Sequence, residues 1–172
     1  MAKSLKNTSK KKITIKKATL SDVKFIFNTY NHGVDKSLLK KKKLLKFKDH
    51  KKWFLENYKS KKVHIYTAYL NILKIGYIRF DFKNRNLAVV SISLNKNYYR
   101  KGYGSIVLNL GILKIKKIPK IQYIIANVFK KNEIFNKFFK KNKFINNKSI
   151  NMKILPKEMF QKNFIFIYHL KI

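Results

Sequence analysis

The sequence predicts an α/β (α+β) fold in which a mixed, mostly antiparallel, twisted sheet is flanked by about four helices. Apolar residues alternate with a period of two over three consecutive segments between positions 63 and 94, a pattern typical of a strand meander. Two segments with helical spacing precede this meander and two follow it. A chain of 172 residues with 45% apolar residues, five Gly and two Pro is suited to one packed domain.

The N-terminal half is expected to supply five elements after a basic arm. Residues 1–11 are polar and basic, which predicts a disordered arm ahead of a single domain at 12–172. Thr19 or Ser21 is expected to cap the first helix, with Asp22 in its first turn, and Asp49 to cap the second. The expected elements are a strand at 13–18, helices at 22–31 and 47–58, and strands at 63–69 and 75–82.

The C-terminal half continues the alternation. The meander closes with a strand at 87–94, and a helix at 103–116 is expected to bury Ile106, Val107, Leu110 and Leu113. The expected elements after it are a buried strand at 121–129, a helix at 132–141, and strands near 144 and at 163–170.

The net charge of +35 invites a nucleic-acid function, which the composition argues against. Only three of the 42 basic residues are arginine (Arg79, Arg85 and Arg100), and arginine is the residue that reads bases through its bidentate fork. Lysine, asparagine and isoleucine all have A/T-rich codons, so the charge is best explained by genomic bias. We therefore expect no nucleic-acid partner, but a field that attracts anionic small molecules.

Several site classes are excluded by residue types. The chain has no cysteine, which removes disulfides, thiolate nucleophiles and cysteine metal sites. Its four histidines show no metal-ligand spacing, so no metal is expected. No secretory signal and no apolar run of membrane-spanning length is present, which predicts a cytoplasmic protein without membrane insertion. The sequence leaves open whether the chain forms a homodimer.

A glycine-bearing loop between the strand at 87–94 and the helix at 103–116 is the strongest functional signal. Its residues are Tyr99-Arg100-Lys101-Gly102-Tyr103-Gly104-Ser105. Free N–H groups and the dipole at a helix N-terminus favour a pyrophosphate, and glycines let it approach the main chain. Arg100 and Lys101 add positive charge at the rim. Val107 stands where a dinucleotide fingerprint needs a third glycine, so that site class is disfavoured.

This loop and a downstream segment resemble the GNAT acetyltransferase superfamily. Residues 99–104 match both glycines of its Gln/Arg-x-x-Gly-x-Gly/Ala motif, with Tyr99 at the Gln/Arg position. Asn132, Lys141 and Phe144 match a second signature, in which Phe139 replaces the usual tyrosine and Lys143 the usual glycine. The resemblance covers roughly residues 13–147 and implies an acetyl-CoA-dependent N-acetyltransferase.

A narrower resemblance concerns the acceptor. Ser37, the His50-x-x-Trp53-Phe54 element and the segments 75–81 and 90–94 are similar to a branch that acetylates the amino group of a UDP-4-amino-sugar in nonulosonic acid pathways. The resemblance implies that Ser37, His50, Trp53 and Arg79 contact that substrate. Trp53 could stack on a uracil or sugar ring, and Arg79 could meet a diphosphate or instead bridge strands.

The resemblance also implies how acetyl-CoA is held. The strands at 87–94 and 121–129 would splay apart around the pantetheine arm, which backbone groups of Ile92, Ser93 and Leu94 would bind. The residues from Arg100 to Ser105 (Arg100, Lys101, Gly102, Tyr103, Gly104 and Ser105) would hold the pyrophosphate, and Asn132 would contact the cofactor arm.

The acid and base of the reaction are open at this stage. Phe139 has no proton to give, which leaves water, Tyr103 or Tyr123 to protonate the thiolate. Asp81 and His50 are the candidate catalytic bases. Asp81 could instead pair with Arg79 or a nearby lysine, and His50 could instead position the substrate or lie on the helix surface. Two other functions compete: a protein N-terminal or ribosomal-protein acetyltransferase of the same fold, and a basic RNA- or DNA-binding module.

Overall fold

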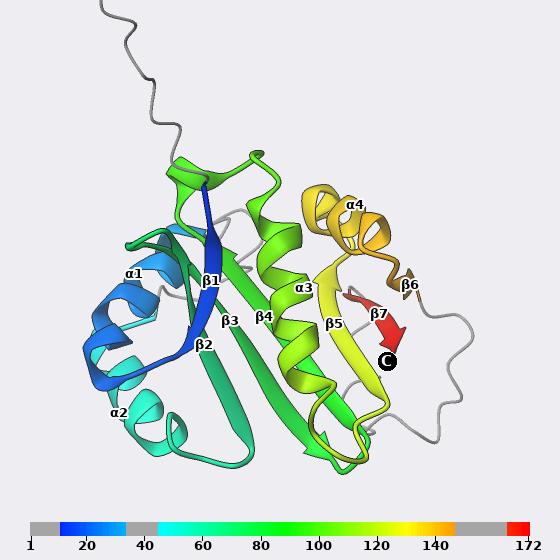
Figure 1. Ribbon diagram of the computed structural model, residues 1–172, viewed down its shortest axis with the longest axis horizontal. Coiled ribbons are helices and arrows are strands. Elements are labelled where there is room, and N and C mark those ends of the chain that lie inside the picture. Colours follow the sequence, from blue (N-terminus) through cyan, green and yellow to red (C-terminus); the bar gives the residue numbers. More distant parts are fainter. Residues whose placement is uncertain (1–10, 34–44, 147–164) are drawn as a thin grey trace, which may run out of the picture.

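The computed structural model describes residues 11–33, 45–146 and 165–172, with no side-chain description at 165–167. The described chain forms a seven-stranded sheet in the order β1-β2-β3-β4-β5-β7-β6 (Figure 1). The strands are β1 (Ile13–Lys17), β2 (Val63–Leu70), β3 (Leu73–Asn84), β4 (Leu87–Leu94), β5 (Tyr123–Phe129), β6 (Ile145–Asn146) and β7 (Ile165–Lys171). Every described strand pairing is antiparallel except that of β4 with β5, which confirms the predicted mixed, mostly antiparallel sheet.

Four α-helices and two short 3-10 helices accompany this sheet in the described part of the chain. They are η1 (Leu20–Asp22), α1 (Val23–Gly33), α2 (Phe47–Asn57), η3 (Lys96–Tyr98), α3 (Tyr103–Ile115) and α4 (Glu133–Lys141). The predicted element order is confirmed, with most ends within about two residues. Nearly all of the predicted arm at 1–11 and Ser37 lie outside the described residues.

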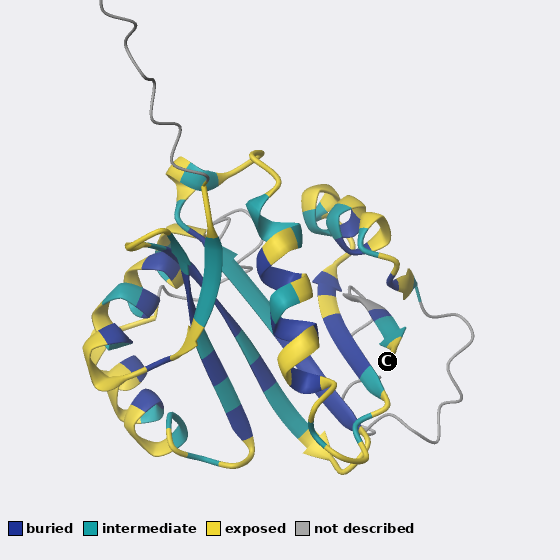
Figure 2. Ribbon diagram, viewed as in Figure 1, coloured by how far each residue is buried: buried dark blue, intermediate teal, exposed yellow. Residues whose placement is uncertain are grey.

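The two faces of the sheet carry separate apolar clusters. Ile78 and Phe80 of β3 pack with α3 and α4 in the larger cluster, whereas Tyr77 packs with Ile26 of α1 and Phe54 of α2 in the smaller one. Because side chains alternate along a strand, α1 and α2 cover the face opposite to α3 and α4. Figure 2 shows the buried residues concentrated on the central strands and on the sheet-facing sides of the helices.

Thr19 and Asp22 form the predicted start of the first helical segment. The Asp22 Oδ2 atom accepts a hydrogen bond from the Thr19 backbone N–H at 2.9 Å. The buried Asp22 carboxylate also pairs with Lys74 Nζ of β3 at 2.6 Å. Burial raises the pKa of Asp22, but the contacts with Lys74, Thr19 and Thr67 outweigh this effect, so its pKa is below the ordinary value.

The sequence suggested that Asp49 caps the second helix, and this prediction is wrong. The α2 helix begins earlier, with Lys46 at the N-cap position, so Asp49 falls within the first turn. A carboxylate in the first turn still interacts favourably with the helix dipole.

The predicted buried face of α3 is correct for Val107 and wrong for Ile106 and Leu113. Ile106 and Leu113 are 43% and 58% exposed, while Val107, Leu108, Gly111, Ile112 and Ile115 are buried. The helix is apolar on most of its surface, so periodicity could not choose between two faces. Gly111 lies on the buried face and favours this choice, because a Cβ there would lie 2.7 Å from Ile78 Cδ1 and 3.0 Å from Phe80 Cζ, so a larger residue would displace these side chains.

Candidate functional site

The sheet opens between β4 and β5. Their parallel pairing extends only from Leu87 opposite Tyr123 to Val89 opposite Ile125, although β4 continues to Leu94 and β5 to Phe129. Beyond that point β3 still pairs with β4, and β7 still pairs with β5. Each strand is therefore held on its outer side while the two diverge, and Figure 1 shows β4 and β5 separated toward the loop that precedes α3.

The strand register identifies the backbone groups that face this separation. The Asn95 N–H donates to the Ile75 carbonyl at 2.8 Å, and the same register pairs Ser93 with Tyr77 and Ser91 with Arg79. In an antiparallel ladder alternate residues direct both backbone groups at the partner strand, so those of Ser93 point to β3. The backbone groups of Ile92 and Leu94 consequently face the separation.

The backbone groups of Ser93 therefore do not face the separation, where a contact with the pantetheine arm was expected. Its hydroxyl donates a 3.3 Å hydrogen bond to the Thr29 carbonyl of α1. A Cβ on Gly33 would lie 2.7 Å from the Ser93 Oγ atom and 3.3 Å from the Tyr99 hydroxyl oxygen. Ser93 and Tyr99 thus dock the end of α1 against β4 and the glycine loop, and the absence of a side chain at position 33 makes this contact possible.

The loop after β4 has the backbone geometry of an anion site. Arg100 and Gly102 have φ values of 57° and 78°, and φ is negative at Lys101 between them. Alternation of sign at successive residues turns their N–H groups toward one side, as in anion-binding nests. The α3 helix begins at Tyr103, and the N–H groups of Tyr103 and Gly104 precede its intrahelical hydrogen bonds. The helix dipole adds a favourable field for an anion at the same point.

The side chains of the loop are partly committed to other contacts. Lys101 Nζ donates to the Asn97 carbonyl at 2.8 Å, so it folds back on η3. Ser105 Oγ accepts a hydrogen bond from Asn142 Nδ2 of the α4 C-cap at 3.1 Å. Asn132 Oδ1 caps α4 by accepting from the Phe135 N–H at 3.1 Å.

The two loop glycines are required for different reasons. Gly102 has open space where a Cβ would be, and its left-handed φ explains the residue type. A Cβ on Gly104 would lie 3.2 Å from the Phe138 ring of α4. Gly104 therefore permits the close contact of α3 with α4, a packing reason for glycine that is separate from the approach of a phosphate.

A cavity of about 320 Å³ lies on the face covered by α1 and α2. Three of its residues, Tyr77, Arg79 and Ile65, come from neighbouring strands, and Tyr77 is opposite Ser93 in the sheet register. The polar and aromatic side chains that line it are Tyr30, Asp49, His50, Trp53, Tyr77 and Arg79. The structure therefore brings together His50, Trp53 and Arg79, which the sequence had assigned to an acceptor.

His50 is a buried residue with one ring nitrogen facing no partner. The residue is 5% exposed, and Nε2 has no hydrogen-bond partner among the described residues. Its ring lies 5.6 Å from that of Phe27 and 5.7 Å from that of Trp53. Burial and the positive charge of Arg79 lower the pKa of His50 more than its hydrogen bond with the Val23 backbone raises it. The imidazole is therefore neutral at neutral pH.

Arg79 is held on two sides. Its NH2 nitrogen is 2.9 Å from Asp81 Oδ2, and the guanidinium carbon lies 4.9 Å from the centre of the Trp53 ring. The Nε atom is buried and has no partner within the described ranges. Asp81 is thus engaged in the ion pair that was the structural alternative to a catalytic role.

Asp81 also lies away from the separation. It pairs with Val89, the last β4 residue that pairs with β5. Ile92 is three residues further along β4, a distance of about 10 Å at the rise of a strand. Direct contact of Asp81 with a thioester at Ile92 would therefore need a water or a polar group of the substrate between them.

Phe139 occupies a packed aromatic position. It is 3% exposed, with the Phe144 ring at 5.1 Å and the Tyr168 ring at 6.1 Å. Tyr123 begins β5 at the paired end of the strands, opposite Leu87, which places it far from the separation and argues against it as a proton donor. Tyr103 begins α3 beside the loop.

A buried polar pair that the sequence had not singled out holds the end of β5. The Tyr168 hydroxyl donates to Asn136 Oδ1 at 3.1 Å, and Asn136 Nδ2 donates to the Lys130 carbonyl at 2.9 Å. These contacts tie α4 and β7 to the segment after β5, and so help to keep β5 apart from β4. The signal in the sequence was an amide between Phe135 and Phe139 on the apolar side of a helix.

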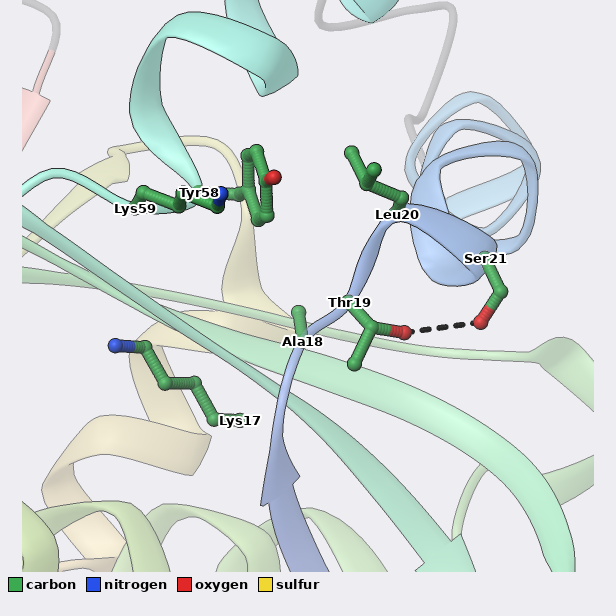
Figure 3. Close-up of a pocket in the computed structure, with 7 residues that line it drawn as sticks. All are labelled: Lys17, Ala18, Thr19, Leu20, Ser21, Tyr58 and Lys59. Carbon is green, nitrogen blue, oxygen red and sulfur yellow. Dashed lines mark hydrogen bonds between the residues drawn. The ribbon is translucent and has the colours of Figure 1, made fainter.

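A second, more open hollow of about 530 Å³ lies where β1 meets η1, beside the end of α2 (Figure 3). Its polar side chains are largely exposed, and Thr19 Oγ1 and Ser21 Oγ lie 2.9 Å apart in a hydrogen bond. None of the buried unpartnered polar atoms of the described chain belongs to its lining residues. The cavity at His50 is therefore the stronger candidate site.

The described part of the chain shows neither a metal-binding cluster nor a membrane-spanning helix. Within the described ranges, no three His, Asp or Glu side chains come together as a metal ion would need. None of the helices there is both long and apolar enough to cross a membrane.

Comparison with known proteins places the fold. No family model and no curated protein matches the sequence. A spermidine N-acetyltransferase from Vibrio cholerae, solved with CoA and spermine, superposes with a TM-score of 0.74 at 14% identity, covering 92% of this chain and 95% of the other. A GNAT-family acetyltransferase from Streptococcus pneumoniae gives 0.66 at 19% identity, covering 94% and 100%. The N-acetyltransferase PseH of Campylobacter jejuni gives 0.64 at 18% identity, covering 92% and 97%. The chain is similar to these proteins in fold, along nearly the whole length of each.

Proposed function

We propose that this chain is an N-acetyltransferase that moves the acetyl group of acetyl-CoA to a primary amine. The observation that carries the proposal is the divergence of β4 from β5 beyond Val89 and Ile125, leading to a loop of alternating φ and the N-terminus of α3. A strand separation with free backbone groups suits an amide-bearing arm, and a helix N-terminus suits a pyrophosphate. The GNAT-like fold of the whole chain supports the same conclusion.

In this proposal the cofactor extends from the loop into the separation. The N–H groups from Arg100 to Gly104 bind the pyrophosphate, with the Arg100 side chain adding charge, whereas the Ser105 N–H already donates to the Gly102 carbonyl at 3.2 Å. Ile92 and Leu94 offer backbone groups to the pantetheine arm, and an N–H there polarises the thioester carbonyl. The Lys101 side chain can bind the cofactor only if it releases the Asn97 carbonyl. Asn132 can bind it only through its side-chain amide nitrogen, since its side-chain oxygen caps α4.

The reaction is a direct attack. The neutral amine approaches from the face of α1 and α2, a C–N bond forms, the C–S bond breaks, and CoA leaves as a thiolate that takes a proton. Water is the simplest donor of that proton, because Phe139 has none. Of the two candidate bases, His50 has an unpaired nitrogen whereas Asp81 is paired with Arg79, so His50 is the better acceptor for a proton relayed through water or substrate.

The acceptor that we propose is a UDP-4-amino-sugar, bound at Ser37, His50, Trp53 and Arg79. Support comes from the His50-x-x-Trp53-Phe54 element, from the aromatic and arginine lining of the cavity, and from a charge of +35 that favours an anionic nucleotide-sugar. The same charge argues against a polyamine such as the spermine bound by one structural neighbour, because it would repel a polycation. It also disfavours a basic protein tail as the acceptor.

The test mixes the purified protein with acetyl-CoA and separate amines, and follows thiol release and the acetylated product. The proposal predicts turnover with a UDP-4-amino-sugar and little with spermidine or with peptides bearing a free N-terminus. Turnover with peptides only would establish the protein-acetyltransferase alternative. Absence of acetyl-CoA binding, together with sequence-independent binding of oligonucleotides, would instead identify a nucleic-acid module and refute the enzyme.

A further inference from the structure

The α4 helix contacts both walls of the separation between β4 and β5. At its C-terminal end, Asn142 Nδ2 donates to Ser105 Oγ in the first turn of α3 at 3.1 Å. The Phe138 ring of α4 lies 3.2 Å from the position that a Cβ on Gly104 would take. Toward its other end, Asn136 makes hydrogen bonds with β7 and with the segment after β5. The helix is therefore placed between the start of α3 and the end of β5.

The Asn136 amide joins three segments that are distant in sequence. Its Oδ1 atom accepts from the Tyr168 hydroxyl of β7 at 3.1 Å, and its Nδ2 atom donates to the Lys130 carbonyl at 2.9 Å, directly after β5. In the sheet Tyr168 is opposite Ala126, the first β5 residue beyond Ile125, where pairing with β4 ends. The connection thus starts where the two strands diverge and ends where β5 ends.

The residue types suit a rigid connection. A hydroxyl donates at one side and a carbonyl accepts at the other, so the residue between them must both accept and donate, which a primary amide does and a carboxylate or an alkyl group does not. Tyr168 and Asn136 are 0% and 9% exposed. Buried polar groups keep their geometry, because another arrangement would leave one of them unpaired. The amide therefore fixes the end of β5 relative to α4.

A sheet needs such a contact to keep two neighbouring strands apart. From Ala126 to Val128, β5 has no described strand partner on the side of β4, and the backbone groups of Ile92 and Leu94 face the same separation. Paired strands lie about 4.8 Å apart and satisfy these backbone groups, so closure of the separation would add hydrogen bonds. Because α4 rests on α3 and holds the end of β5, it opposes this closure.

We infer that Asn136 and Tyr168 are positioning residues for the cofactor, which set the width of the separation that the pantetheine arm enters. A separation held in advance does not have to be opened by the ligand, and this raises affinity. Neither residue belongs to the glycine loop or lines the cavity at His50, so their effect is confined to the arm. This inference rests on the proposed acetyltransferase function.

The test measures the Kd of two ligands by calorimetric titration of the full chain. CoA carries the pantetheine arm, whereas 3′-phospho-ADP has the same adenosine 3′-phosphate and pyrophosphate without it. Tyr168→Phe removes one oxygen and keeps the ring beside Phe139, and Asn136→Leu removes the amide from the other side of the contact. Each should raise the Kd of CoA about tenfold, the effect of one buried hydrogen bond, and leave that of 3′-phospho-ADP unchanged.

Two further measurements separate positioning from a loss of stability. Ile115→Val truncates a buried residue at the far end of α3 and should lower stability by a comparable amount without changing the Kd of either ligand. The double variant should bind CoA no more weakly than Asn136→Leu alone, because both changes remove the same contact. In turnover assays the KM for acetyl-CoA should rise in both single variants, while the KM for the acceptor amine should not.

Unchanged CoA affinity in Tyr168→Phe and Asn136→Leu would overturn the inference and leave the acetyltransferase proposal intact. An equal loss for CoA and 3′-phospho-ADP would also overturn it, because the contact would then support the fold in general rather than the arm. If the wild-type protein binds no CoA, or binds it no more tightly than 3′-phospho-ADP, the proposed function itself fails. The variants remove the same contact from opposite ends, so either one alone decides the outcome.

Discussion

Lys143 illustrates how a single residue closes an element of this fold. It follows α4 with a left-handed φ of 65°, at the position where the resembled family has glycine. Its N–H donates to the Lys140 carbonyl, and the Phe144 N–H donates to the Phe139 carbonyl, both at 3.0 Å. Contact between the Phe139 and Phe144 rings completes a Schellman ending.

Replacement of Lys143 by glycine should therefore stabilise the protein. A non-glycine residue in the left-handed region costs roughly 1 kcal/mol, which Lys143→Gly would remove without altering the hydrogen bonds. Urea unfolding monitored by circular dichroism would measure the gain. Lys137→Gly, at an exposed position inside α4, should have the opposite sign and lose about 1 kcal/mol. Equal effects of both changes would show that the left-handed conformation is not strained.

His50 should make the free energy of unfolding depend on pH below neutrality. Its pKa in the folded state is below the ordinary value of 6.5 because it is buried beside Arg79. The unfolded chain then binds more protons than the folded chain, so stability falls as the pH decreases through about 6.5 toward the lower folded pKa. Unfolding measured between pH 7.5 and pH 5 should show a steeper loss for wild type than for His50→Phe. The pH dependence of the unfolding free energy that remains in His50→Phe is expected to come partly from His64 and His169, because burial also lowers their pKa values.

At the scale of elements, Gly76 constrains the end of the β4 segment that diverges from β5. It lies opposite Leu94, and a Cβ at this position would be 2.4 Å from the Ser93 carbonyl oxygen and 2.9 Å from Leu94 Cα. Both neighbours include backbone atoms, which cannot move aside as a flexible side chain could. The close approach of β3 therefore holds the β4 segment whose other edge, at Ile92 and Leu94, faces the separation.

Gly76→Ala should displace that segment and impair catalysis. We expect a loss of about 1–3 kcal/mol in stability, as for other overpacked positions, together with a large fall in kcat because the carbonyl-polarising N–H moves. Val90→Ala, which truncates a buried β4 side chain, serves as a variant destabilised by a comparable amount. If the two variants retain similar kcat values at a temperature where both are folded, the role of Gly76 in placing β4 is refuted.

At the scale of the whole molecule, the charge of +35 should act through long-range attraction. The Debye length decreases from about 10 Å at 0.1 M salt to about 3 Å at 1 M, so the general field is screened while short contacts persist. The Kd of CoA should rise several-fold between 0.05 and 0.5 M NaCl, and the KM of an uncharged or cationic amine should not rise with it. Calorimetric titration of CoA at several salt concentrations tests this, and a Kd independent of salt would mean that the lysine surface does not assist binding.

Much of the fold could be predicted from local pattern. The period of two from 63 to 94, the helical spacing elsewhere and the cap at Thr19 depend on neighbours in the chain, and the structure has the corresponding elements. The face of α3 could not be predicted, because Ile106 and Leu113 are as apolar as the residues that are buried. The contact of Gly111 with Ile78 and Phe80 of β3, which are remote in sequence, favours the observed face.

The candidate site was likewise predictable from the sequence only in part. The sequence by itself determined the order of elements and the glycine loop, because a left-handed turn before a helix needs particular residues at particular positions. It also supplied His50, Trp53 and Arg79, without their relation to one another. Only the tertiary structure decided that β4 and β5 separate beyond Val89. It also decided that the backbone groups of Ser93 point to β3 and that Asp81 pairs with Arg79. These facts arise from strand register and from contacts between segments far apart in the chain, which local residue patterns do not encode.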